Sequence, residues 1–251
     1  MAEGSPVITL RNVSKSFASL LVLRDVSLRV AGDEIVGIVG PSGAGKTTIL
    51  KLITGLLTPD AGTVTIARGA LGYVFQEPRL LPWRTALDNV AAPLRAQGQG
   101  KAAAREAAAG WLERVGLAGF ERYHPAELSG GMAQRVSLAR AFAVEPRVLL
   151  MDEPFANVDV DLKGSLMDLL ESIVKERKTT VVYVTHELPE ALRLADRVVE
   201  LAPDHGLREL DLSDRAAVAR EWAARSVGDP RQLDAGDAAG PGVGGTAKPR
   251  S

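Results

Sequence analysis

Residues 34–47 read EIVGIVGPSGAGKT, an apolar run followed at once by a glycine-rich loop. The run at 35–39 is typical of a strand that is buried on both faces of a sheet. The loop at 40–47 fits the pattern G-x-x-x-x-G-K-[ST], and at 46–57 the apolar residues recur at helical spacing. A phosphate loop between a buried strand and a helix predicts an α/β protein that binds a nucleoside triphosphate.

The glycines of this loop let the backbone wrap around a phosphate and aim successive N–H groups at it, and the following helix adds the positive end of its dipole. The Lys46 side chain can reach the β- and γ-phosphates, and the Thr47 hydroxyl can ligate Mg²⁺. The residues expected to bind the nucleotide are Gly40, Pro41, Ser42, Gly43, Ala44, Gly45, Lys46, Thr47 and Thr48. The alternative is a chance glycine-rich turn, which the flanking strand and helix disfavour.

A second acidic stretch, VLLMDE, occupies residues 148–153. Ligands gather at the carboxyl ends of parallel strands, so Asp152 is expected to hold Mg²⁺ at the end of an apolar strand. Glu153 is then free to polarise the attacking water. The alternative is that these acids only cap the next turn, and the phosphate loop elsewhere in the chain disfavours it.

The order of the expected elements predicts the fold class. Apolar and polar residues alternate through much of the first 36 residues, which indicates half-exposed antiparallel strands. Later in the chain, strands alternate with helices, which indicates a mostly parallel sheet covered on both faces. The expected strands lie at 63–66, 71–75, 148–151, 180–185, 197–201 and 207–212, and the expected helices at 130–140, 162–177 and 189–194. An alanine-rich helical block begins at residue 85, with a solvent-facing helix at 101–109.

We therefore expect an α/β P-loop NTPase fold with a mostly parallel sheet, an N-terminal antiparallel β-subdomain and an inserted helical subdomain at about 85–145. The ATPase domain is expected to span 1–212. Residues 213–251 are expected to hold a charged helix and, in the Gly-, Ala- and Pro-rich part, a disordered tail.

Bulk composition excludes several classes of protein. The 251 residues include no cysteine, so neither disulfides nor thiolate metal sites can form. A formal net charge of -1 gives no reason to expect nucleic acid as a partner. Neither an apolar run of membrane-spanning length nor a secretory signal is visible in the sequence, so we expect the chain to stay on the side of the membrane where it is made.

The stretch LSGGMAQR at 128–135 resembles the signature motif of ABC transporter ATPases. Ser129, Gly130 and Gly131 open a helix and offer a second set of N–H donors to an anion. The resemblance implies that two copies meet head to tail, each closing the other's ATP with its signature. Met132 departs from the commonest form, but it lies past the glycines and should leave the anion cradle intact.

Further positions over residues 7–201 match the same family. The resemblance implies that Gln76 contacts Mg²⁺ and the lytic water, and that His186 contacts the γ-phosphate. It also implies that Asp159 lies in the loop that crosses the dimer interface, and that Phe17 stacks on adenine. Each has a plainer alternative. Gln76 could belong to a surface loop, and His186 could simply end a strand. Asp159 could be a helix N-cap, and Phe17 could pack in the core. The loop with Asp159 reads Ala-Asn-Val-Asp rather than the commoner small-Ala-Leu-Asp. This departure is expected to bear on crosstalk between the two sites, but Asp159 itself remains.

The stretch QEPRLLPW at 76–83, followed by LDNV at 87–90, looks like the nitrate, sulfonate and taurine group of import ATPases. Its apolar residues could form a socket for a permease helix, or could pack the base of the helical subdomain. The resemblance implies an ATP- and Mg²⁺-dependent homodimer on the cytoplasmic face of the membrane, with separate integral-membrane permease subunits and, indirectly, a solute-binding protein. The rivals are a soluble ABC ATPase that acts on nucleic acid or ribosomes, and an ABC exporter ATPase.

Overall fold

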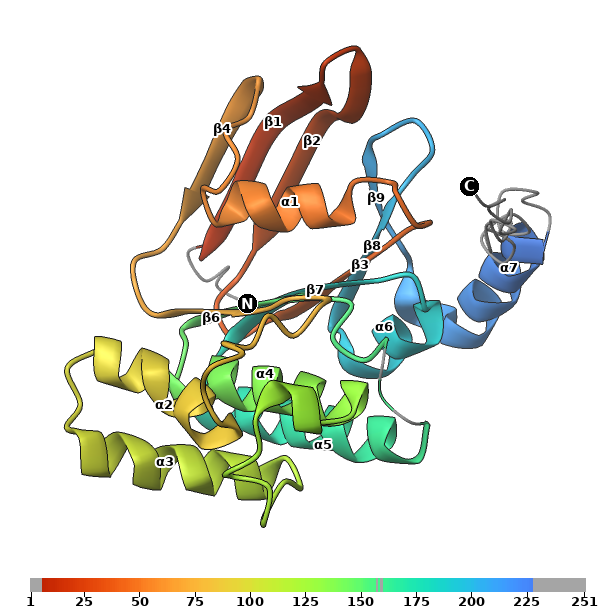
Figure 1. Ribbon diagram of the computed structural model, residues 1–251. Helices are drawn as coiled ribbons and strands as arrows, with labels where there is room; N and C mark the ends of the chain where they lie inside the picture. Colours follow the sequence, from red (N-terminus) through yellow and green to blue (C-terminus); the bar gives the residue numbers. More distant parts are fainter. Residues whose placement is uncertain (1–5, 157, 159, 228–251) are drawn as a thin grey trace, which may run out of the picture.

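The computed structural model describes residues 6–156, 158 and 160–227. Its elements form three layers, with a small antiparallel sheet and one helix above a larger sheet, and a group of helices below it (Figure 1). The predicted α/β class is confirmed.

The small sheet has the strand order β2-β1-β4, and both of its pairings are antiparallel, as the alternating pattern predicts. Its strands are β1 (Ile8–Phe17), β2 (Leu20–Val30) and β4 (Ala61–Ile66). The first of the expected strands after the phosphate loop was placed at 63–66, yet β4 already begins at Ala61. Gly62 has φ +83°, and a Cβ there would lie 2.3 Å from the Asn12 carbonyl oxygen, so only glycine allows the two strands to come this close.

The large sheet has the order β5-β6-β7-β3-β8-β9, and only the β8–β9 pairing is antiparallel. Its strands are β3 (Ile35–Val39), β5 (Leu71–Val74), β6 (Val148–Asp152), β7 (Thr180–Thr185), β8 (Arg197–Leu201) and β9 (Leu207–Glu209). The helices are α1 (Lys46–Ile53), α2 (Ala86–Ala96), α3 (Lys101–Arg114), α4 (Gly130–Ala143), α5 (Val160–Arg177), α6 (Leu188–Leu194) and α7 (Arg215–Val227), with short 3₁₀ turns at Pro125–Glu127 and Leu212–Asp214.

Alternate residues of the large sheet pack into two cores. Ile38, Leu150 and Val182 face α1 and the antiparallel sheet. Leu149 and Val181 face the layer of helices that includes α4, α5 and α6. The strands are therefore buried on both faces, which explains their continuous apolar character in the sequence.

Two predicted details of the helices are wrong. The helix after the phosphate loop ends at Ile53 and not at residue 57, because Gly55 follows in a left-handed conformation (φ +74°) that ends a helix. The helix at 101–109 is not solvent-facing all round, because Ala104 and Ala108 are fully buried. Their small side chains let α3 approach its neighbours closely, which propensity alone does not reveal.

None of the helices in the described ranges combines the length and apolar character that crossing a membrane requires.

We expect Leu150→Ala to lower the free energy of unfolding by about 2–5 kcal/mol, because the side chain is fully buried in the middle of the sheet and its removal leaves a cavity. Urea denaturation measures this loss. Leu56→Ala is the matched control, because Leu56 is exposed just after α1, and its effect should stay within about 0.5 kcal/mol. Equal losses in the two variants would contradict the assigned core.

Candidate functional site

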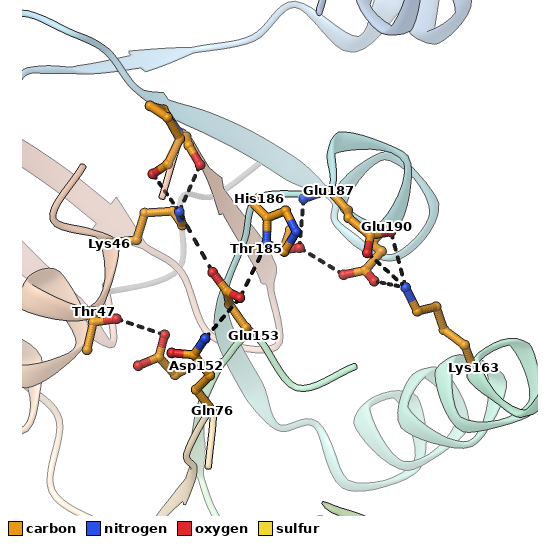
Figure 2. A network of polar contacts seen from close by, with 12 residues as sticks. Lys46, Thr47, Gln76, Asp152, Glu153, Lys163, Thr185, His186, Glu187 and Glu190 are labelled. Atoms are coloured by element: carbon orange, nitrogen blue, oxygen red, sulfur yellow. Dashed lines mark hydrogen bonds and ion pairs between the residues drawn. The ribbon is translucent and has the colours of Figure 1, made fainter. Parts of the chain in front are cut away.

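The carboxyl ends of β3, β6 and β7 meet at one edge of the large sheet, where the polar residues expected from the sequence converge (Figure 2). The register sets this meeting point, because Asp152 in β6 pairs with Val184 in β7, and Val39 in β3 pairs with Thr185. The side chains brought together are those of Lys46, Thr47, Gln76, Asp152, Glu153 and His186.

The phosphate loop joins the end of β3 to the start of α1. Gly43 (φ +78°) and Gly45 (φ +109°) are left-handed, a conformation that favours glycine. A Cβ at Gly45 would lie 2.5 Å from Cγ1 of Val22, so the antiparallel sheet packs directly against the loop. The loop thus has the tight backbone that a phosphate cradle needs.

Lys46 lies beneath this loop and is almost fully buried. Its ammonium donates hydrogen bonds to the carbonyl oxygens of Gly40 (2.8 Å) and Pro41 (2.9 Å), and lies 4.0 Å from Oε1 of Glu153. Burial lowers the pKa of Lys46, and the charges of Glu153 and Asp152 oppose that shift. The cation is therefore held between the loop and the carboxylates at the end of β6.

The Thr47 hydroxyl donates a hydrogen bond to Oδ1 of Asp152 at 2.9 Å. Burial raises the pKa of Asp152, and the bond from Thr47 acts in the opposite direction. Across the described ranges no three Asp, Glu, His or Cys side chains cluster as a metal cage. A hydroxyl and one carboxylate side by side nevertheless fit Mg²⁺, which commonly takes one or two protein carboxylates and completes its shell with phosphates and water.

Glu153 is the point on which three groups converge. Its backbone is left-handed (φ +45°), an unusual conformation for a glutamate, and its N–H donates to the Val184 carbonyl at 2.9 Å. The turn aims its carboxylate at the site. Oε2 accepts a hydrogen bond from Nε2 of Gln76 at 3.3 Å and lies 3.3 Å from Nδ1 of His186. A carboxylate held in this way can accept a proton from water.

The signature residues lie in the opposite layer. Ser129 is the N-cap of α4 and accepts a hydrogen bond from the Met132 N–H at 3.2 Å. α1 packs in the core above the large sheet and α4 in the core below it, so the two helices that begin with glycine-rich segments lie on opposite faces (Figure 1).

Phe17 is the last residue of β1 and is 45% exposed, so the alternative of core packing is wrong. Thr48 lies in the first turn of α1. Asp159 lies outside the described residues.

Gln134 is a residue of the site region that the sequence analysis missed. It is buried in α4, and its Nε2 donates to the carbonyl oxygens of Phe75 (3.3 Å) and Pro154 (3.2 Å). It thereby ties the signature helix to the residue before Gln76 and to the residue after Glu153. The sequence did offer one signal: Gln134 lies on the same face of the expected helix as Leu138 and Ala141, and a polar side chain on an apolar face indicates a buried hydrogen bond.

The fold and this site define a P-loop nucleoside triphosphatase. The family model described as ABC transporter matches residues 23–156, and the chain belongs to the ABC transporter family.

Curated relatives cover most of the chain. The aliphatic sulfonates import ATP-binding protein SsuB 2 of Burkholderia lata is 45% identical over 82% of this chain and 76% of its own length. The taurine import ATP-binding protein TauB of Yersinia pestis bv. Antiqua is 44% identical over 73% of this chain and 75% of its own. A solved dimeric ATP-binding cassette, bound to ADP and Pi after hydrolysis, is 34% identical with a TM-score of 0.77, over 82% of this chain and 98% of that one.

We expect Gln134→Leu to destabilise the fold by about 1–3 kcal/mol, because two carbonyl groups would lose a buried donor. Chemical denaturation followed by circular dichroism measures the loss. Gln97→Leu, at the exposed end of α2, is the control and should change little. A Gln134→Leu variant as stable as the control would show that this tie does not hold the site.

Proposed function

We propose that the chain is the ATP-hydrolysing subunit of an ABC importer that moves a sulfonate-, taurine- or nitrate-type solute through a separate permease. The observation that carries the hydrolytic part is the convergence of Gln76 and His186 on the Glu153 carboxylate, next to Lys46 and the phosphate loop. The solute class is supported by the relatives named for sulfonates and taurine.

In the proposed reaction, the loop N–H groups and Lys46 bind the β- and γ-phosphates of ATP. Thr47, Asp152 and Gln76 would hold Mg²⁺, which neutralises charge on the phosphates when bound. Glu153 orients the attacking water and accepts its proton, and His186, which lies 3.3 Å from that carboxylate, is available to contact the γ-phosphate. Lys46, charged and almost fully buried, stabilises the negative charge that develops as the bond to the leaving phosphate breaks.

The proposed working unit is a homodimer. Ser129, Gly130 and Gly131 of one copy would close over the ATP held by the loop of the other, and Asp159 would cross the interface. The N-terminus of α4 suits an anion from another molecule, because it opens in a different layer from the phosphate loop. Phe17, exposed at the end of β1, is available to stack on adenine.

The proposed permease contact is the loop between β5 and α2. Leu80 packs against the core, whereas Trp83 is 72% exposed. Asn89 holds the loop firmly, since its Oδ1 accepts from the Leu81 N–H at 2.7 Å and its Nδ2 donates to Leu81 and Arg84 carbonyls. The loop would thus pack against the helical subdomain through Leu80 and present the aromatic ring of Trp83 to an integral-membrane subunit. A solute-binding protein would act indirectly, through that subunit. Copurification with such a subunit would support the proposed peripheral association with the membrane and separate this proposal from a soluble ABC ATPase.

We expect Glu153→Gln to bind ATP with little change but to lower its hydrolysis by about 100-fold or more, because glutamine keeps the shape but cannot accept the proton. Phosphate release and equilibrium nucleotide binding measure the two quantities. Glu145→Gln is the matched control, since Glu145 is another left-handed glutamate but its side chain is exposed and pairs with Arg177. Turnover of Glu153→Gln at the control's rate would remove Glu153 from the catalytic role.

A further inference from the structure

A second polar cluster lies beside His186, on the side away from the phosphate loop (Figure 2). Its members are Lys163 in the first turn of α5, Thr185 at the end of β7, and Glu187 and Glu190 at the start of α6. None of these four side chains was assigned a role by the sequence motifs.

The contacts of this cluster hold the two residues that flank His186 in the chain, Thr185 and Glu187. Lys163 Nζ lies 2.5 Å from Oε1 of Glu190 and 3.1–3.2 Å from both carboxylate oxygens of Glu187. The other oxygen of Glu190 accepts the Thr185 hydroxyl at 2.9 Å. The Thr185 oxygen in turn accepts the Glu187 N–H at 3.0 Å, so the residues on both sides of His186 are tied.

The burial of the Glu190 carboxylate explains why Lys163 is needed beside it. The Glu190 side chain is 6% exposed and that of Lys163 is 19% exposed, and a buried carboxylate requires a charged or hydrogen-bonding partner. Burial acts to lower the pKa of Lys163, but the hydrogen bonds to Glu190 and Glu187 outweigh it and raise the pKa, so the lysine stays charged. A cation in the first turn of a helix opposes the helix dipole, so α5 itself gains nothing from this residue.

We propose that Lys163 is a positioning residue for ATP hydrolysis, and that it fixes His186 against Glu153 by holding Glu190, Glu187 and Thr185. This inference rests on the hydrolytic function proposed above. It makes the position of His186 depend on the start of α5, which follows the predicted interface residue Asp159 in the sequence.

Arg193 provides the comparison that separates positioning from simple docking of the two helices. Its Nη2 lies 2.6 Å from Oδ1 of Asp168, so it also joins α6 to α5. That pair is exposed and makes no contact with Thr185 or Glu190 in the described structure. A variant at Arg193 therefore breaks an α5–α6 ion pair without releasing the His186 segment.

The kinetic test compares Lys163→Met, Lys163→Arg and Arg193→Met in the full chain. We expect Lys163→Met to lower kcat for ATP about tenfold or more, because a small displacement of a group that contacts the reacting phosphate has large effects. The KM for ATP should change little, since Lys46 and its loop are untouched. Lys163→Arg should keep most of kcat, and Arg193→Met should resemble the unmodified chain. A wild-type kcat in Lys163→Met would overturn the proposal.

A second readout needs no nucleotide. The chain has three histidines, and His124 and His205 lie away from this cluster, ahead of the Pro125–Glu127 turn and between β8 and β9. In ring-selective nuclear magnetic resonance spectra, Lys163→Met should move the signals of His186 and leave the other two in place, whereas Arg193→Met should move none. Unmoved His186 signals in Lys163→Met would contradict the positioning role of Lys163, whether or not the chain hydrolyses ATP. Absence of ATP hydrolysis by the unmodified chain would instead refute the proposed function.

Glu187→Gln covers the case in which Lys163→Met does not fold. Glu187 is the more exposed of the two glutamates, so its neutral isostere leaves the buried Lys163–Glu190 pair intact. We expect a smaller loss of kcat and a smaller displacement of the His186 signals. No change in either quantity would count against the proposal.

Discussion

The parallel pairing of β3, β7 and β6 sets the spacing of every group in the site. Asp152 lies opposite Val184 and Val39 lies opposite Thr185, so the phosphate loop, the two carboxylates and His186 all leave the sheet at the same edge. The Glu153 N–H still bonds to the Val184 carbonyl and thus extends the ladder by one residue, after which the left-handed turn sends the chain away. Both cores support this pairing, because β3, β6 and β7 are each covered by apolar side chains on both faces of the sheet.

Charge explains why the groups must be held so firmly. Lys46 and Asp152 are both buried, and burial of either charge alone would be costly. Asp152 is stabilised by Thr47, and the Glu153 carboxylate lies between Lys46 and His186. A nucleotide bound with Mg²⁺, as proposed, would add charges of both signs at once, and a site already arranged in this way would need little rearrangement to bind it. Gln134 and Lys163 act in a similar way farther out. Gln134 ties α4 to Pro154, which follows Glu153, and Lys163 ties α5 to Glu187, which follows His186.

Short motifs predicted the core of the site because its geometry is local. The phosphate loop needs only a strand, glycines and a helix in sequence order, and Asp152 and Glu153 need only the end of an apolar strand. The alternating pattern of the first strands and the strand–helix alternation after residue 130 likewise predicted both sheets. The signature stretch added the family, which the comparisons with known proteins confirm.

What the sequence could not reveal depends on contacts between distant residues. Gln134 bonds to a residue 59 positions away, and Lys163 to one 27 positions away. Nothing near either residue in the sequence indicates that partner. The burial of Ala104 and Ala108 could not be predicted either, because alanine is as common on the exposed face of a helix as at a close contact between helices. The proposed division of the chain near residue 212 remains a prediction.

The central claim is that ATP binds between two copies of this chain, the phosphate loop of one facing the signature of the other. Sedimentation of the full chain with Mg²⁺ and a non-hydrolysable ATP analogue tests it most directly. The account predicts a shift from 26.6 kDa to twice that mass, lost in Lys46→Ala together with nucleotide binding and lost in Ser129→Arg with binding retained. A chain that binds the analogue yet keeps the mass of one copy, even beside its permease, would contradict the claim.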